Sequence, residues 1–141
     1  METKMKKNIL VIDGQGGGMG KQLVSAIKAK INDVQVMAVG TNSAAASAMH
    51  KAGADMAATG ENAVIVACRK ADIIVGPLGI VIADSLCGEI SPKMSVAVGQ
   101  SEAKKILVPA NRCGNIVVGV EDTSMSKLID RVIDEITREV C

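Results

Sequence analysis

Short apolar runs alternate with longer stretches of helical spacing along almost the whole chain. The runs that are rich in β-branched residues predict six strands, at residues 8–12, 34–39, 54–58, 73–75, 105–108 and 116–120. Between them, the spacing predicts a helix that begins near Gly18 or Gly20, a second that Ser43 caps and Gly53 terminates, and others at residues 59–70, 80–86 and 92–102. Residues 64–66 also have strand propensity, but the basic residues that follow them favour a helix end.

The last predicted helix is the clearest element, because one face of it is apolar over its whole length. The stripe within residues 125–140 consists of Met125, Leu128, Ile129, Val132, Ile133, Ile136 and Val140. Strands that alternate with helices predict a parallel sheet covered on both faces. We therefore expect one α/β domain over residues 1–141, a doubly wound three-layer α/β/α sandwich with a mostly parallel six-stranded sheet in the Rossmann-like order 3-2-1-4-5-6. Residues 1–7 precede the first strand and are expected to be flexible.

Composition narrows the classes of partner. The 141 residues include 16 basic and 15 acidic side chains, giving a formal net charge of +1, and no Phe, Tyr or Trp. This balance and the lack of aromatic rings argue against a nucleic-acid partner. The longest uncharged apolar stretch, residues 73–83, is about half of a membrane span, and the amino end lacks the apolar run of a signal peptide. Four cysteines without a CxxC pair are typical of reduced thiols, so we expect a cytoplasmic protein with no metal site.

Five glycines within seven positions form the strongest local signal. The string Asp13-Gly14-Gln15-Gly16-Gly17-Gly18-Met19-Gly20-Lys21 lies between the first predicted strand and the first predicted helix. Glycine is needed where the backbone adopts positive φ, or where an anion approaches backbone amides without meeting a Cβ. The helix that follows adds the positive end of its dipole. The string therefore predicts a cradle for phosphate or pyrophosphate, and a tight structural turn is the alternative.

The match of this string to phosphate-binding fingerprints is partial. Gly14-x-Gly16 fits a dinucleotide loop, but Met19 stands where the third glycine is expected, and that glycine falls at Gly20. A P-loop is a worse fit, because Gln22 stands where a hydroxyl side chain holds magnesium.

Asp13 complicates the predicted cradle. A carboxylate beside a phosphate costs energy unless a cation or a hydrogen bond compensates it. Asp13 can hold the loop amides, orient Lys21 or recruit a divalent metal, and an Asp before a Gly is also ordinary turn chemistry.

Other polar and small residues follow the remaining predicted strands. In an open parallel sheet, ligands lie outside the carboxyl ends of the strands, where strand order reverses. The residues expected there are Thr41, Asn42 and Ser43 after the second strand, Gly76 and Pro77 after the fourth, and Asn111 and Arg112 after the fifth. The Gly76 loop is expected to face the Gly16 loop. The acidic residue that commonly grips an adenosine ribose at the end of the second strand is missing, and the neutral groups there suit a 2′-phosphate better than a bare diol.

Candidates for catalysis are few. His50 falls within an alanine-rich helix, where a solvated or packed imidazole is the simpler interpretation. Cys113 follows Arg112 at a strand end, and a neighbouring cation can lower the pKa of a thiol. No catalytic residue is assigned.

Several strings together resemble a family of short bacterial proteins known only as a domain of unknown function. They are residues 12–18, 40–42, 59–63, 76–80, 88–92 and 109–113. The resemblance spans residues 8 to 137, and it implies a Rossmann-like domain that stands alone. It implies no activity and no catalytic residue.

Three functions remain open at this point. The first is a nucleotide-binding protein, with NADP or NAD as the first ligand and an adenine nucleotide as the second. The alternative is a non-enzymatic sensor or interaction module that binds a small anion and forms a homodimer through apolar helix faces. The third is a small phosphate-ester or acyl-transfer enzyme that uses Asp13 or Cys113.

Overall fold

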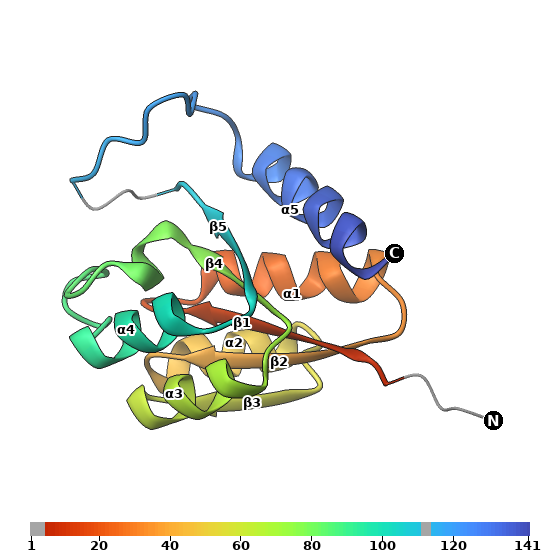
Figure 1. Ribbon diagram of the computed structural model, residues 1–141, viewed down its shortest axis with the longest axis horizontal. Coiled ribbons are helices and arrows are strands. Elements are labelled where there is room, and N and C mark those ends of the chain that lie inside the picture. The colour runs from red at the N-terminus through yellow and green to blue at the C-terminus, as the bar shows by residue number, and fades with distance from the viewer. Residues whose placement is uncertain (1–4, 111–113) are drawn as a thin grey trace.

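The computed structural model describes residues 5–110 and 114–141, and it contains one parallel sheet (Figure 1). The strands are β1 (Lys7–Asp13), β2 (Val34–Gly40), β3 (Met56–Thr59), β4 (Ile73–Pro77) and β5 (Lys104–Val108). Their order across the sheet is β3-β2-β1-β4-β5. All four pairings are parallel, so the predicted fold class and strand order are confirmed for these five strands.

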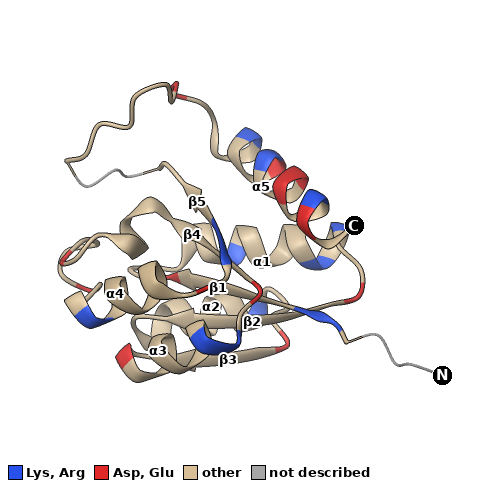
Figure 2. Ribbon diagram, in the orientation of Figure 1, with Lys and Arg blue, Asp and Glu red and all other residues tan. Residues whose placement is uncertain are grey.

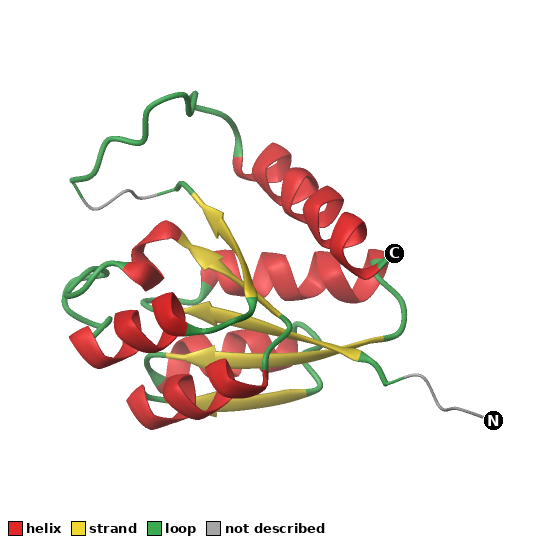
Figure 3. Cartoon of the chain, in the orientation of Figure 1, coloured by secondary structure: helices red, strands yellow, loops and turns green. Residues whose placement is uncertain are grey.

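Helices cover both faces of the sheet, as predicted (Figure 3). The helices are α1 (Gly18–Lys30), α2 (Ser43–Lys51), α3 (Glu61–Lys70), the short 3₁₀ helix η1 (Leu78–Val81), α4 (Pro92–Gln100) and α5 (Met125–Val140). Side chains of α1, α2 and α5 share one buried apolar cluster, and those of α3 and α4 share another. Within the described residues, no helix has both the length and the apolar character needed to cross a membrane.

The two clusters follow from the alternation of side chains along the strands. Ile9 and Val11 of β1 point into the cluster under α1 and α5, whereas Leu10 and Ile12 point into the cluster under α3 and α4. All four side chains are at most 1% exposed. This explains why residues 9–12 of β1 are all apolar, since a central parallel strand is buried on both faces.

Helix α5 has the amphipathic pattern that the sequence predicts. Ile129, Val132, Ile133 and Ile136 are buried against the first cluster. Acidic and basic residues lie at many of the other positions of the helix (Figure 2). One of them, Asp130, lies 3.5 Å from Lys30 Nζ at the end of α1. Both side chains are more than half exposed, so this pair adds little to stability beside the buried stripe.

The predicted sixth strand, residues 116–120, is wrong. This segment is not part of the sheet, and Ile116 and Val118 are 89% and 93% exposed. The connection from β5, residues 109–115, is shorter than the dozen or so residues that a parallel crossover needs. Despite its strand propensity, this segment therefore does not pair with β5 of the same chain.

The predicted helix at residues 80–86 is also wrong. The chain forms η1 and then a series of turns to residue 90, in which Asp84, Leu86, Cys87 and Gly88 all have positive φ. A right-handed helix cannot contain these conformations. At α2, the predicted cap Ser43 is the first helical residue, and Asn42 caps the helix by accepting a hydrogen bond from the Ala45 amide at 2.8 Å.

Candidate functional site

The glycine-rich loop lies at the carboxyl edge of the sheet, beside the point where strand order reverses. β1 and β4 are neighbours, and from them the order runs outward to β3 on one side and β5 on the other. Asp13 pairs with Gly40, and Gly40 with Thr59, so the loops after β1, β2 and β3 leave the sheet at one edge. Open α/β sheets bind their ligands in this region.

Asp13 closes the glycine-rich loop on itself. Its buried carboxylate accepts a hydrogen bond from the Gly14 amide at 2.8 Å through Oδ1 and from the Gly20 amide at 2.6 Å through Oδ2. Burial raises the pKa of Asp13, the nearby charge of Glu89 adds to this, and the two amide bonds oppose it. Of the roles open to Asp13, the geometry therefore supports the first, in which it holds loop amides.

Three glycines of the loop are required by packing. A Cβ on Gly14 would lie 2.5 Å from Thr41 Oγ1, and one on Gly20 would lie 2.6 Å from Met49 Sδ and 2.8 Å from Asp13 Cβ. Gly17 has φ +73°, and a Cβ there would lie 2.8 Å from Ala45 Cα. These glycines let the loop turn and let α1 start close against β1 and α2.

Gly16 and Gly18 differ from these three. A Cβ on either would have no neighbouring heavy atom within 4 Å, and both residues are exposed. Over the whole described part of the chain, nothing accepts a hydrogen bond from the amides of Gly16, Gly18 or Met19. The loop therefore has an open side that presents backbone N–H groups at the start of α1.

Glu89 bridges the loops that follow β1 and β2. Its Oε1 accepts hydrogen bonds from Thr41 Oγ1 at 2.6 Å, from Asn42 Nδ2 at 2.7 Å and from the Gln15 amide at 3.0 Å. The bond from Thr41 is the largest cause that lowers the pKa of Glu89, followed by the bonds from Gln15 and Asn42, while desolvation opposes them. Glu89 is therefore ionised at neutral pH.

The segment that carries Glu89 holds an uncommon backbone conformation. Asp84, Leu86 and Cys87 have φ of 65°, 53° and 56°, and a left-handed conformation costs a non-glycine residue about 1–2 kcal/mol. Buried Leu86 and Ile90 anchor the segment in the cluster beneath α3 and α4. Strained backbone of this kind is concentrated at functional sites.

Thr41 and Asn42 use their side chains to position neighbours. The Thr41 hydroxyl donates to Glu89, and Asn42 Nδ2 donates to Glu89 and, at 2.9 Å, to the Gln15 carbonyl. Asn42 Oδ1 caps α2. The structure thus brings these residues together with Asp13, Gly14 and Gln15, while Ser43 lies exposed on the first turn of α2.

The other predicted site residues lie in different surroundings. Gly76 and Pro77 are buried at the end of β4, where a Cβ on Gly76 would lie 2.5 Å from the Ile12 carbonyl oxygen. That contact accounts for the glycine without a ligand. Lys21 is exposed and lines a groove of about 610 Å³ between α1, α2 and α5. Asn111, Arg112 and Cys113 lie outside the described residues.

Sequence reasoning assigned no role to Glu89. Glu89 belongs to the string of residues 88–92, which supported the family resemblance, but it lies 48 positions after Thr41. Its contact with the end of β2 depends on the left-handed turns at residues 84–88, which a helix predicted at 80–86 would not produce. A signal was present in Gly88, since a glycine in a turn often marks positive φ.

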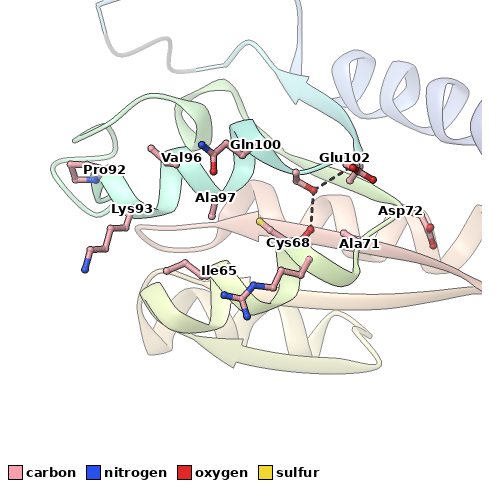
Figure 4. Close-up of a pocket in the computed structure, with 13 residues that line it drawn as sticks. Ile65, Cys68, Ala71, Asp72, Pro92, Lys93, Val96, Ala97, Gln100 and Glu102 are labelled. Atoms are coloured by element: carbon pink, nitrogen blue, oxygen red, sulfur yellow. Dashed lines mark hydrogen bonds between the residues drawn. The ribbon is translucent and has the colours of Figure 1, made fainter.

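A separate groove lies between α3 and α4 (Figure 4). It has a volume of about 920 Å³, and its lining includes Ile65, Val96 and Lys93. Cys68 also lines it, and burial raises the pKa of this thiol to about 11, so the thiol is protonated at neutral pH. The groove involves no residue of the glycine-rich loop.

Of the candidates for catalysis within the described residues, Asp13 lies in the loop and His50 does not. His50 is exposed on the last turn of α2. Within residues 5–110 and 114–141, no three or more His, Cys, Asp or Glu side chains form a group that could hold a metal ion.

Comparison with known proteins identifies the family. Residues 8–141 match the family described as Domain of unknown function (DUF3842). The chain belongs to this family. The resemblance that the sequence strings indicate is thereby confirmed, and comparison with curated proteins finds no match.

A comparison with solved structures finds a protein of similar size. It is a dodecameric FMN-dependent UbiX-like decarboxylase from Escherichia coli O157:H7, 17% identical, with a TM-score of 0.47 over 93% of this chain and 94% of that one.

Proposed function

We propose that this domain binds a nucleotide, with a phosphate group seated on the open side of the glycine-rich loop. The observation that carries the proposal is that Gly16 and Gly18 have open space at their Cβ positions, and that the amides of Gly16, Gly18 and Met19 meet no acceptor among the described residues. Amides at a helix start that no side chain covers are a common site for phosphate.

The different roles of the glycines in the loop support this proposal. In dinucleotide-binding loops, one glycine permits a tight turn, one permits close approach of the pyrophosphate, and one permits close packing of helix on strand. Here Gly14 packs against Thr41, Gly16 and Gly18 leave an approach open, and Gly20 packs α1 against Asp13 and Met49. The packing glycine falls one position later than the fingerprint expects, at Gly20, and its amide donates to Asp13.

The charge of Asp13 is compatible with a bound phosphate. Two amide hydrogen bonds already stabilise this carboxylate, and it is buried on the inner side of the loop. A phosphate on the outer side meets the Gly16, Gly18 and Met19 amides and the positive end of the α1 dipole. The proposal concerns binding, and no reaction is assigned to the chain.

Thermal-shift titration tests the proposal directly. Purified protein is titrated with NAD, NADP, ATP, FMN and inorganic phosphate, and a nucleotide at about 100 times its Kd adds roughly 2.7 kcal/mol of stability. Gly16→Val and Gly18→Val should keep the fold and lose the shift, because the branched side chain covers the amides. Gly99→Val is the matched control, since Gly99 is also exposed with nothing within 4 Å of its Cβ position. Binding that survives both loop substitutions would refute the cradle.

A second copy of this chain is a further proposed partner. β5 forms an edge of the sheet, and residues 116–120, which have strand propensity, pair with no strand in the described part of the chain. Two copies related by a twofold axis would each offer both elements to the other. The sequence predicted a homodimer through apolar helix faces, and we propose instead that it forms along this edge.

A further inference from the structure

We infer that Glu89 is the acceptor for the ribose hydroxyls of the bound nucleotide, and that it selects nucleotides with a free 2′,3′-diol, such as NAD, over those with a 2′-phosphate, such as NADP. The inference rests on the proposed function, since it needs a nucleotide in the glycine-rich loop. It assigns a role to a residue that lies far along the chain from both β1 and β2.

The position of Glu89 fits this role. Dinucleotide-binding domains of this architecture commonly place a carboxylate at the end of the second strand, where it accepts hydrogen bonds from the ribose. This chain has Thr41 and Asn42 after β2, and both donate to Glu89 Oε1. A carboxylate is thus present at the end of β2, although it arrives from the segment that follows β4.

The two carboxylate oxygens of Glu89 have different surroundings. Oε1 accepts three hydrogen bonds, from the loops after β1 and β2. Oε2 accepts none from any group in the described part of the chain, and the side chain is partly exposed. Oε1 therefore fixes the orientation of the group, and Oε2 is available to accept from a hydroxyl donor.

The charge of Glu89 opposes a 2′-phosphate. The hydrogen-bond donors that could face such a phosphate, Thr41 Oγ1 and Asn42 Nδ2, are already directed at Glu89. No described Lys or Arg forms an ion pair with Glu89. A phosphate dianion is repelled by a carboxylate that has no cation paired with it in the described part of the chain, whereas two ribose hydroxyls are attracted. The neutral composition of residues 41–43, considered alone, favoured the opposite selectivity.

Glu89 is also held in place before any ligand binds. Leu86 and Ile90 on either side of it are 4% and 1% exposed, and the Asp84 amide donates to the Ile90 carbonyl at 2.7 Å. A carboxylate fixed in this way loses little conformational entropy on binding. The left-handed residues before it are consistent with a segment whose shape serves the site.

Isothermal titration calorimetry with NAD and NADP tests the inference. The wild-type chain should bind NAD at least about tenfold more tightly than NADP, a difference of roughly 1.4 kcal/mol. Glu89→Gln keeps the size of the side chain and removes the charge, so NAD binding should weaken and the ratio of the two Kd values should approach one. Glu61→Gln is the matched control, because Glu61 lies at the first turn of α3 and accepts from Ser91 Oγ at 2.6 Å. It should leave the ratio unchanged.

The outcomes separate the inference from the proposed function. If neither nucleotide binds the wild type, the proposed function fails and the inference fails with it. If the wild-type chain binds both nucleotides, and binds NADP as tightly as NAD or more tightly, the inference is wrong and the proposed function stands. This outcome can be read from the wild-type chain alone. If Glu89→Gln bound both nucleotides more tightly than the wild type by the same factor, Glu89 would only block the loop, and the inference would also be overturned.

Discussion

Replacing Asp13 with Asn tests whether this side chain holds the glycine-rich loop together. Asp13 is 6% exposed, and each of its oxygens accepts a hydrogen bond from a backbone amide, at 2.8 Å from Gly14 and 2.6 Å from Gly20. Asparagine has one oxygen and one NH₂ group. One of the two amides would therefore face a donor instead of an acceptor.

The expected loss of stability follows from these contacts. A hydrogen bond to a charged group contributes about 1.5–3 kcal/mol, and a buried donor left without an acceptor costs about 1–3 kcal/mol. Burial raises the pKa of Asp13, which means that its charge is costly to bury, and removing this charge offsets part of the loss. We expect a net decrease of roughly 2–4 kcal/mol in the free energy of unfolding. Since the entropy of unfolding for a chain of this length is about 0.3 kcal/mol per kelvin, Tm should fall by roughly 7–13 °C.

Denaturant and thermal unfolding, followed by far-UV circular dichroism, measure this change. Asp33→Asn is the control, because Asp33 is exposed with φ 60°, a conformation that asparagine adopts readily. If Asp13→Asn lost no more stability than this control, the two amide bonds would not hold the loop. The open amides of the loop would then not be fixed in position by Asp13 before a ligand binds.

Two further predictions concern Glu89 and the exposed segment after β5. The bond from Thr41 lowers the pKa of Glu89, so ionised Glu89 stabilises the fold fully above its unfolded pKa of about 4.3, and this stabilisation is lost as the pH falls through the folded pKa. The Tm difference between the wild type and Glu89→Gln should therefore narrow from pH 7 to about pH 3. A Tm difference that stayed constant over this range would contradict the argument. The double variant Ile116→Asp and Val118→Asp should lower the mass measured by light scattering from that of a dimer to that of a monomer. The Tm of the monomer should not change, because both side chains are exposed. A dimer that persists in this variant would exclude this edge as the interface.

The fold was largely predictable from the sequence because its main determinants are local. The apolar run of β1 and the stripe of α5 each specify an element, and the alternation of strand and helix limits the topology. The predicted strand at 116–120 failed for a non-local reason, since propensity does not report whether the connection is long enough to reach the sheet edge.

The candidate site was only partly predictable. The sequence shows glycines and their spacing, and it correctly located the loop between β1 and α1. It cannot show which glycines pack and which are open, because that depends on Ala45 and Met49 of α2. Glu89 was missed for the same reason, since four left-handed residues between positions 84 and 88 direct it to Thr41 and Asn42.

Gly16 and Gly18 carry the argument for function because packing does not explain them. Neither has a positive φ or a neighbour that would exclude a Cβ, and an alanine at such a position stabilises a protein by roughly 0.4–1 kcal/mol. Gly99 in α4 shares these properties, so one open glycine alone has little meaning. Gly16 and Gly18 differ from it because their amides and that of Met19 have no acceptor within the described residues. Asp13 and Glu89 also hold the loop in place from two sides. A loop that served only as a turn would gain stability by replacing both glycines, whereas a loop that receives a phosphate must keep them.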